Sequence, residues 1–335
     1  MSASTAGASL LEVRLPDAVL SDLSQVEERL RVEIASDVRR IQTVGSHVLQ
    51  AGGKRLRPAI TCLAARCLRP DRLGPRLWAI SAALELVHMA TLVHDDVVDH
   101  TATRRGQPTA NRLYGNGVAV LTGDYLLARA MRMLSDDGDL NVIRAIAEVT
   151  IDMSEGEVMG LLALNDATLS EERYYEILRK KTAVFIAACA RCGAIVGEAT
   201  PDQERSLADF GLSLGTAFQV TDDLLDYVGD PTVTGKPLGS DLREGRVTLP
   251  FLMAMAAASP AERRLLEQAL GQPELSDLRF AAIVEVLDRT GAIAASRCAA
   301  ERLARQACEA LQSLPDSEAR DSAQALAEYA ARRER

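Results

Sequence analysis

The chain of 335 residues is poor in aromatic side chains, which make up 4% of it, and it has a single tryptophan. Lys and Arg number 38 against 47 Asp and Glu, and this net charge of -9 argues against a general nucleic-acid binder. Apolar runs such as Leu249–Ala258 fall short of the roughly 18–20 residues of a transmembrane helix. Residues 1–15 lack the apolar segment of a signal peptide. We therefore expect neither a membrane span nor a signal sequence.

Metal-binding cysteine patterns are also scarce. Cys189 and Cys192 form the CxxC of the chain, but no second CxxC or pair of histidines completes a four-ligand zinc site. The residues around them are rich in alanine and typical of a buried helix. We interpret the six cysteines as structural thiols, which suits a reduced, cytoplasmic protein.

What the chain has in abundance is helix-forming sequence. Hydrophobic residues recur at steps of three and four over long stretches, among them residues 19–49, 77–98 and 202–227. No Ser/Gly-rich linker or change of composition divides the chain. The pattern predicts one all-α domain over residues 1–335, a helical bundle whose most apolar helices surround a central apolar cavity.

Two acidic quintets, DDVVD at 95–99 and DDLLD at 222–226, stand inside apolar runs. On a helix, residues i, i+1 and i+4 lie within about one quadrant of the surface, so each quintet gathers three carboxylates. One such quintet alone is more often a solvated helix end or a helix cap. Two of them flanked by bulky apolar residues favour a site for Mg²⁺, which carries substrate phosphates. The predicted metal ligands are Asp95, Asp96, Asp99, Asp222, Asp223 and Asp226.

Basic residues follow or precede these quintets. Residues 52–58 read GGKRLRP, a Gly-rich turn in which Lys54 and Arg57 can hold an anion, although a basic helix N-terminus would look the same. Arg104 and Arg105 come just after the first quintet, within reach of phosphates that it holds. His88 lies two turns before Asp95, where a hydrogen-bonded core histidine is the alternative. The remaining candidates are Lys181, Thr182, Gln219, Lys236 and Arg246.

Several longer stretches together resemble the trans-type (all-E) polyprenyl diphosphate synthases. They are GGKRLRP at 52–58, ELVHMATLVHDDVVD at 85–99, RRGQPT at 104–109, GDYLLARA at 123–130, EGEV at 155–158, KTA at 181–183, FQVTDDLLDY at 218–227 and GKPLGSDLREGRVTLP at 235–250. The resemblance spans residues 50–250. It implies a single all-α bundle, a homodimer, three Mg²⁺ ions in each active site, and condensation of isopentenyl diphosphate with an allylic diphosphate.

The resemblance also implies a role for each matching residue. Lys54, Arg57, His88 and Arg105 would bind the diphosphate of isopentenyl diphosphate. Arg104, Lys181 and Lys236 would contact the allylic diphosphate, which Mg²⁺ bridges to the two quintets. Thr182 and Gln219 would line the reacting centre. Many family members have Lys where Arg246 stands, and a planar guanidinium is not equivalent to an ammonium group.

Product length should depend on the residues one turn before the first quintet. Ala90 and Thr91 are both small, so a growing chain can pass them toward a deeper floor, for which Met131, Met133 and Met153 are candidates. We expect an all-trans product of about C30–C50, of the kind used for quinone side chains and handed to the membrane. The alternatives are a C20 geranylgeranyl product and Ala90 serving only helix packing.

Two other classes of protein would share part of this sequence pattern. Terpene cyclases share an all-α bundle and an aspartate-rich metal site, but they have no need of the GGKRLRP and RRG motifs and use aromatic rings, which are few here. A non-catalytic subunit of a heteromeric synthase would be expected to lose some of the aspartates or basic residues, and this chain keeps them all. The sequence therefore favours the catalytic synthase.

Overall fold

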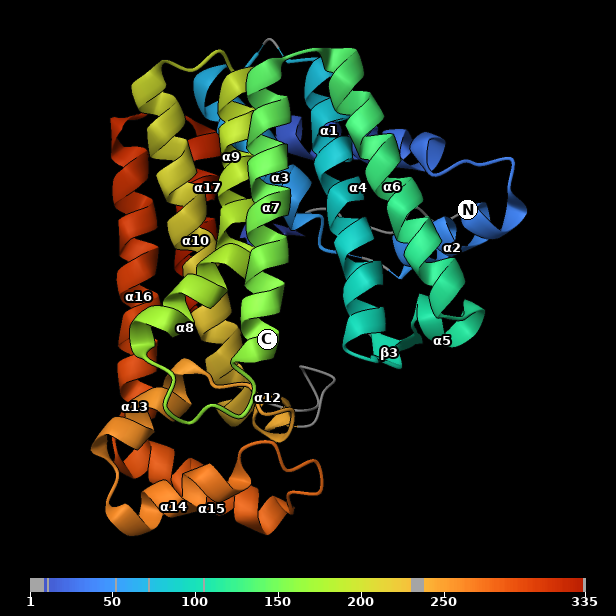
Figure 1. Cartoon of the computed structure of the whole chain (residues 1–335). Helices are drawn as coiled ribbons and strands as arrows, with labels where there is room; N and C mark the ends of the chain where they lie inside the picture. Colours follow the sequence, from blue (N-terminus) through green and yellow to red (C-terminus); the bar gives the residue numbers. More distant parts are fainter. Residues whose placement is uncertain are drawn as a thin grey trace. The chain divides into compact units, whose positions relative to one another are not determined.

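A computed structural model of the chain describes residues 9–10, 12–51, 53–71, 73–104, 106–229 and 238–333. Over these residues the fold is almost entirely helical, with two short antiparallel hairpins, β1–β2 and β3–β4, as its strands (Figure 1). The predicted all-α class is confirmed. The elements are β1 (Ser9–Leu10), β2 (Val13–Arg14), α1 (Asp17–Glu33), α2 (Arg39–Gln50), α3 (Leu56–Leu68), α4 (Pro75–Val98), β3 (Thr103–Arg104), β4 (Gln107–Pro108), α5 (Ala110–Tyr114), α6 (Asn116–Asp137), α7 (Leu140–Leu162), α8 (Glu171–Leu178), the π-helical turn η1 (Arg179–Ala183), α9 (Val184–Val196), α10 (Pro201–Val228), α12 (Ser240–Arg243), α13 (Leu249–Ala257), α14 (Pro260–Ala269), α15 (Asp277–Arg289), α16 (Ala292–Ala310), the 3₁₀ turn η2 (Leu311–Ser313) and α17 (Glu318–Arg332).

The chain forms two compact units. Unit 1 comprises Met1–Ala147, Ala188–Ala208 and Ser313–Ala323, and unit 2 comprises Glu148–Ala187, Asp209–Gln312 and Gln324–Arg335. Helices α7, α9 and α10 each begin in one unit and end in the other. The organisation as a single domain, expected from the sequence, stays a prediction.

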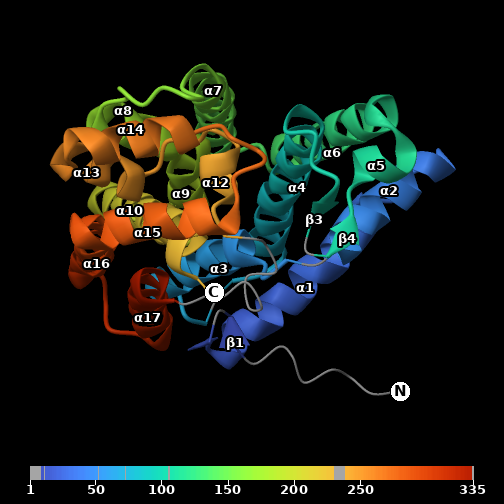
Figure 2. The same ribbon diagram turned by 90° about the horizontal axis from the view of Figure 1, so that it is seen from below.

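Helix α4 is the central helix of unit 1. It begins with Pro75, whose fixed φ suits the first helical position, and most of its side chains are buried. It packs against α1, α3 and α6, and Figures 1 and 2 show α4 and α6 side by side. Such surroundings explain why its sequence is apolar nearly all the way round.

By length and composition α4 could also cross a membrane, although 67% of its most apolar window is buried within the protein. We expected no apolar segment as long as a membrane span, and for α4 this expectation was wrong. Glu85 and His88 interrupt its apolar run, but its mean hydropathy stays as high as that of a membrane span. A buried core helix meets the same criterion, so the finding is weak evidence for a membrane span.

The long helix predicted over residues 19–49 is wrong. The structure has two helices, α1 and α2, with a break between Glu33 and Arg39. In this break the Ser36 hydroxyl accepts a hydrogen bond from the Val38 backbone N–H at 3.2 Å. Side chains such as Ser compete in this way with helical hydrogen bonds, and the hydrophobic periodicity does not reveal it.

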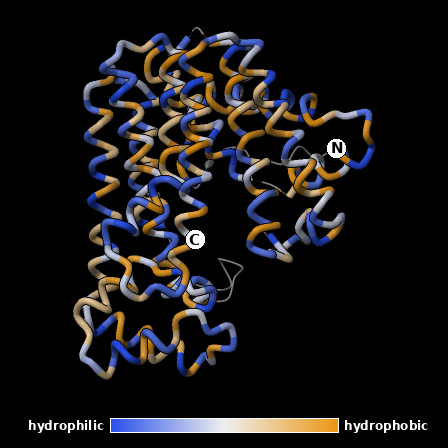
Figure 3. Tube along the Cα trace, in the orientation of Figure 1, coloured by the Kyte–Doolittle hydropathy of each residue, from blue (hydrophilic) through white to orange (hydrophobic). Residues whose placement is uncertain are grey.

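Unit 2 has its own apolar core. One cluster brings Tyr227, Phe251 and Ile283 together with their neighbours, and a second joins Tyr174 and Val220 with α13, α16 and α17. Gly215 of α10 lies so close to Ala183 that a Cβ there would come within 2.8 Å of the Ala183 Cα. Hydrophobic and hydrophilic residues alternate along the helices (Figure 3), as expected of helices that each bury one face.

Candidate active site

The first quintet occupies the last turn of α4, as predicted. Asp95 is half-buried and Asp99 is exposed, and they lie one turn apart, with the Asp99 N–H donating to the Asp95 carbonyl at 2.8 Å. Asp96 differs from both, because it is buried and its Oδ1 accepts from Arg104 Nε at 2.9 Å and Nη2 at 2.8 Å. The three carboxylates of this quintet are therefore not equivalent.

The predicted basic loop after this quintet is the β3–β4 hairpin, which folds back onto the helix end (Figure 1). Asn111 Nδ2 donates to the Asp96 carbonyl at 2.9 Å, and the Thr109 hydroxyl donates to the Thr101 carbonyl at 2.7 Å. These bonds fix the hairpin that delivers Arg104 to Asp96. The neighbouring Arg105 lies outside the described residues.

Three of the four residues predicted to bind the diphosphate of isopentenyl diphosphate lie in or next to two neighbouring helices of unit 1, α3 and α4. Lys54 is exposed just before α3, and Arg57 is half-buried in the first turn of α3. His88 is half-buried on α4, against which α3 packs. The His88 carbonyl accepts a hydrogen bond from the Thr91 hydroxyl at 2.8 Å, which ties up the polar group of Thr91.

Lys181 and Thr182 lie in the π-helical turn η1 of unit 2. The turn is marked by the Val184 N–H, which donates to the carbonyl of Arg179 five residues earlier. Gly156 of α7 lies against it, and a Cβ there would meet the Lys181 backbone nitrogen at 2.7 Å. Lys181 Nζ pairs with Glu157 at 2.8 Å. Such π-turns are frequent at functional sites, and this one contains two predicted site residues.

Asp223 is the buried member of the second quintet. Its Oδ2 accepts from the Tyr174 hydroxyl at 2.7 Å, and its Oδ1 accepts from Gln219 Nε2 at 3.0 Å. Burial raises the pKa of Asp223 to about 7, with further upward contributions from the charges of Asp222 and Asp226 and opposing ones from the two hydrogen bonds. Gln219 therefore holds Asp223 in this structure, besides its predicted place at the reacting centre.

Asp222 and Asp226 have different partners. Asp222 Oδ1 accepts from Arg333 Nη2 at 2.8 Å, and the Arg333 guanidinium lies 3.7 Å from the centre of the Phe218 ring. Asp226 accepts from the Ser240 hydroxyl at 2.6 Å and from the backbone N–H groups of Ser240 and Asp241 at 3.1 and 3.0 Å. Asp226 thus anchors the first turn of α12.

Whether these carboxylates fit Mg²⁺ can be judged from their charges. Among the described side chains, no three His, Cys, Asp or Glu groups form a ready metal site. In unit 2, however, burial and the charges of Asp223 and Asp226 raise the pKa of Asp241 well above its ordinary value. Carboxylate oxygens are the ligands that Mg²⁺ prefers, and a divalent cation relieves the repulsion between neighbouring carboxylates. The residues therefore fit the ion.

Other parts of the site carried weaker sequence signals or lie outside the described chain. Arg246 Nε donates to Glu244 Oε2 at 2.9 Å, and the Arg246 N–H donates to the Asp241 carbonyl at 2.8 Å, while Lys236 lies outside the described residues. The sequence motifs did not indicate Tyr174, Asp241 and Arg333 as residues of the site. Asp241 could have been found in the GSDLREGRVTLP stretch, whereas Arg333 lies more than 100 residues from Asp222 without any motif.

Comparison with known proteins decides the family. The model of the Polyprenyl synthetase family matches residues 38–287, three quarters of the chain and all the predicted site residues. The chain belongs to this family. An octaprenyl diphosphate synthase of Escherichia coli is 38% identical over 322 residues, which cover 96% of this chain and 99% of that protein.

Solved structures agree with this family membership. A decaprenyl diphosphate synthase from Rhodobacter capsulatus superposes with a TM-score of 0.89 at 38% identity, covering 95% of this chain and 98% of that one. A polyprenyl synthase from Caulobacter crescentus, complexed with calcium and isoprenyl diphosphate, gives 0.89 at 35% identity, with coverages of 98% and 99%. The expected isoprenoid-synthase bundle and the expected class of enzyme, a trans-prenyltransferase, are confirmed.

Proposed function

We propose that this family member condenses isopentenyl diphosphate with farnesyl or geranylgeranyl diphosphate and makes an all-trans product of about C30–C50. The observation that carries the proposal is the complete set of motifs, from GGKRLRP to GSDLREGRVTLP, inside the family match at 38–287. The octaprenyl and decaprenyl names of the relatives support the product range. A C20 product is the second candidate, because the motifs do not determine where growth stops.

Mg²⁺ bound by aspartates of the quintets would hold the diphosphate of the allylic substrate. When bound, Mg²⁺ supplies Lewis-acid neutralisation of the charge that develops on the leaving diphosphate. Asp95 and Asp99, one turn apart, offer carboxylates on one face of α4, and Asp222 is the most exposed carboxylate of the second quintet. Three ions in each site remain part of the proposal.

Positive side chains would complete this neutralisation. Arg104 and Lys181 are the described candidates for contact with the allylic diphosphate, together with Lys236. In this structure Arg104 pairs with Asp96 and Lys181 with Glu157, so each cation is already oriented by a carboxylate. When the diphosphate binds, its oxygens would accept hydrogen bonds from these guanidinium and ammonium groups. Such charge-assisted hydrogen bonds become stronger as water is excluded.

The reaction itself requires an ionised allylic carbon, attack by the double bond of isopentenyl diphosphate, and loss of a proton. Lys54, Arg57, His88 and Arg105 would hold isopentenyl diphosphate for that attack. Thr182 and Gln219 would steady the cation with their oxygen dipoles. We assign the proton to the departing diphosphate, since no described side chain in the site is an evident base. Exclusion of water prevents competing hydrolysis.

Product length would be set within unit 1 by the first quintet's helix. Ala90 is 2% exposed, and Thr91 is half-buried with its hydroxyl bound to the His88 carbonyl, so neither presents a bulky or polar group to a prenyl tail. Met131 and Met133 lie on α6, the helix that packs along α4. Met153, the third methionine proposed from the sequence, lies instead on the part of α7 that belongs to unit 2.

The test of the activity uses the purified chain alone with Mg²⁺, isopentenyl diphosphate and farnesyl diphosphate. Chromatography of the dephosphorylated products should show chains of C30–C50. A ladder ending at C20 would support the second candidate. No elongation by the chain alone, with a folded protein and both primers tried, would contradict the proposal and favour a subunit that needs a partner.

We also propose that the enzyme is a homodimer. In unit 2, α7 exposes Ile151, Val158 and Leu162, spaced by seven and four residues and therefore on one helix face, and Leu161 beside them. An unpartnered apolar stripe of this kind suits an identical face on a second copy, and the interfaces of homodimers are rich in such side chains.

Replacing Val158 and Leu162 together by aspartate should dissociate this dimer. Each buried aspartate costs the interface about 2 kcal/mol or more, so the mass in sedimentation equilibrium should fall from twice 36.1 kDa to 36.1 kDa. Leu278 of α15 is 85% exposed and is the matched control, whose change to aspartate should leave the mass unchanged. An unaltered mass for the double variant would contradict this interface.

The compartment and the fate of the product complete the proposal. All six cysteines lie in the described part of the chain and none of them forms a disulfide there, which suits the reducing cytoplasm. A product of C30–C50 is an apolar chain that a membrane would receive, and a quinone side chain is the use that we propose for it. Nucleic acid is not among the proposed partners, because the net charge is -9.

A further inference from the structure

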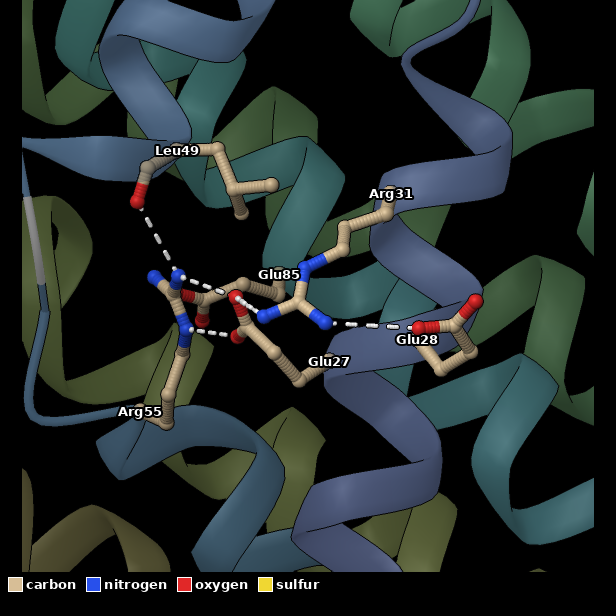
Figure 4. A network of polar contacts seen from close by, with 6 residues as sticks. All are labelled: Glu27, Glu28, Arg31, Leu49, Arg55 and Glu85. Carbon is tan, nitrogen blue, oxygen red and sulfur yellow. Dashed lines mark hydrogen bonds and ion pairs between the residues drawn. The ribbon is translucent and has the colours of Figure 1, made fainter. Parts of the chain in front are cut away.

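Arg55 stands between the two predicted clamp residues, Lys54 and Arg57, yet its own guanidinium points into unit 1 (Figure 4). Nε donates to Glu27 Oε2 of α1 at 2.9 Å, Nη1 donates to Glu85 Oε1 of α4 at 3.2 Å, and Nη2 donates to the Leu49 carbonyl of α2 at 3.1 Å. The side chain is 18% exposed. One guanidinium therefore joins three helices at the point where α3 begins.

The backbone of Arg55 is constrained as well. With φ 48° and ψ 38° it lies in the left-handed region, which costs free energy for any residue except glycine. Such a conformation persists where the surroundings hold it, and here the hydrogen bonds of the guanidinium to Glu27, Glu85 and the Leu49 carbonyl do so. Directly after it, the Ala59 N–H donates to the Arg55 carbonyl at 3.0 Å and closes the first turn of α3.

Glu85 connects this junction with the helix of His88. It is 3% exposed, and it precedes His88 by three residues, so the two side chains leave the same face of α4. Nearby carboxylates raise the pKa of Arg55, although burial opposes them, so the guanidinium stays charged while it is held between Glu27 and Glu85. The Arg55–Glu85 pair thus links the loop of Lys54 and Arg57 to the helix that carries His88.

We propose that Arg55 is a positioning residue for the isopentenyl diphosphate site. It does not touch the substrate but sets the distance of Lys54 and Arg57 from His88, and the inference rests on the proposed assignment of these three residues to that diphosphate. A planar guanidinium reaches three acceptors at once, which a lysine ammonium on one point cannot reproduce. Misplacement of binding groups by about 1 Å can cost about 100-fold in reactivity.

Two variants of Arg55 and one of Glu85 separate the possible roles. Arg55→Gly accepts the left-handed backbone without cost but removes the guanidinium, and Arg55→Lys keeps the charge. Glu85→Gln keeps the shape of the partner but removes its charge. Arg31 is the matched control, since it belongs to the same network through Glu28 and Glu27 but is 61% exposed and does not reach α3 or α4 (Figure 4).

The first readout is steady-state kinetics with each substrate varied in turn. For Arg55→Gly we expect the KM for isopentenyl diphosphate to rise 10- to 100-fold and the KM for farnesyl diphosphate to change less than threefold. Arg55→Lys and Glu85→Gln should give intermediate increases, and an enzyme that carries both Arg55→Gly and Glu85→Gln should be no worse than Arg55→Gly alone. Arg31→Met should resemble the unchanged enzyme.

The second readout is calorimetric titration with isopentenyl diphosphate alone, which needs no turnover. Its affinity should fall by the same factor in the Arg55 variants, while circular dichroism at the assay temperature shows folded protein. An Arg55→Gly enzyme with unchanged KM and affinity would overturn the proposal, and so would equal increases in both KM values. If Arg55→Gly does not fold, the KM values and affinities of Arg55→Lys and Glu85→Gln test the proposal in its place. Failure of the unchanged enzyme to bind isopentenyl diphosphate would instead contradict the proposed function itself.

Discussion

Changing Asp95 to alanine is expected to lower kcat by about three orders of magnitude, since removal of one group that stabilises transition-state charge commonly costs about 10²–10³-fold. Asp96 of the same quintet is buried and paired with Arg104, whereas Asp95 is half-buried and Asp99 is exposed, so Asp95 and Asp99 are the more accessible carboxylates for Mg²⁺. Loss of either carboxylate would weaken the binding of the allylic diphosphate.

The measurement is turnover as a function of Mg²⁺ concentration with both substrates saturating. The Asp95→Ala enzyme should need more Mg²⁺ for half-maximal activity, and its affinity for isopentenyl diphosphate alone should remain within a factor of three. Asp136 lies on the surface of α6 and is the matched control, whose change to alanine should leave kcat unchanged. Near-normal turnover of Asp95→Ala would contradict the metal assignment.

Changing Ala90 to phenylalanine is expected to shorten the product from C30–C50 to about C15–C20. Ala90 is 2% exposed, so a phenyl ring placed there either enters an apolar channel or collides with packed neighbours. Collision in a close-packed core would cost about 1–3 kcal/mol of stability. Entry into a channel would leave the melting temperature nearly unchanged while blocking the tail.

Product chromatography and thermal unfolding together distinguish these outcomes. Ala83 lies on the same face of α4, seven residues or about 10 Å further from the quintet, so Ala83→Phe should give products longer than those of Ala90→Phe. An unchanged product distribution for a folded Ala90→Phe enzyme would refute the role of Ala90 as a floor position. A lowered melting temperature with normal product length would show that Ala90 serves helix packing.

Much of the fold follows from local sequence. The helices expected over residues 77–98 and 202–227 correspond to α4 at Pro75–Val98 and α10 at Pro201–Val228, because long apolar periodicity and a starting proline are local signals. The break between α1 and α2 was missed, since Ser36 interrupts the helix through a side-chain hydrogen bond, which the hydrophobic pattern does not reveal. The π-turn at Lys181 was equally invisible, because it depends on the close approach of Gly156.

The candidate site divides in the same way. Residue type and spacing alone identified both quintets and the clamp motif, since three carboxylates on one helix face and a Gly-rich basic turn can be recognised without coordinates. The family was indicated by the resemblance of the longer motifs. Only the tertiary structure distinguished the carboxylates from one another. Asp96 is held by Arg104, Asp223 by Tyr174 and Gln219, and Asp222 by the distant Arg333.

The sequence by itself therefore indicated the all-α fold class and a metal–diphosphate site, because these depend on residue types at local spacings, and the resemblance of its motifs indicated the family. The tertiary structure decided which member of each motif faces its partners and what orients it. Arg55 is the clearest case, since the sequence assigned it no role within GGKRLRP, whereas its guanidinium joins Glu27, Leu49 and Glu85 inside unit 1. The physical reason is that a buried charge must find partners, and those partners come from helices 6 to 30 residues away.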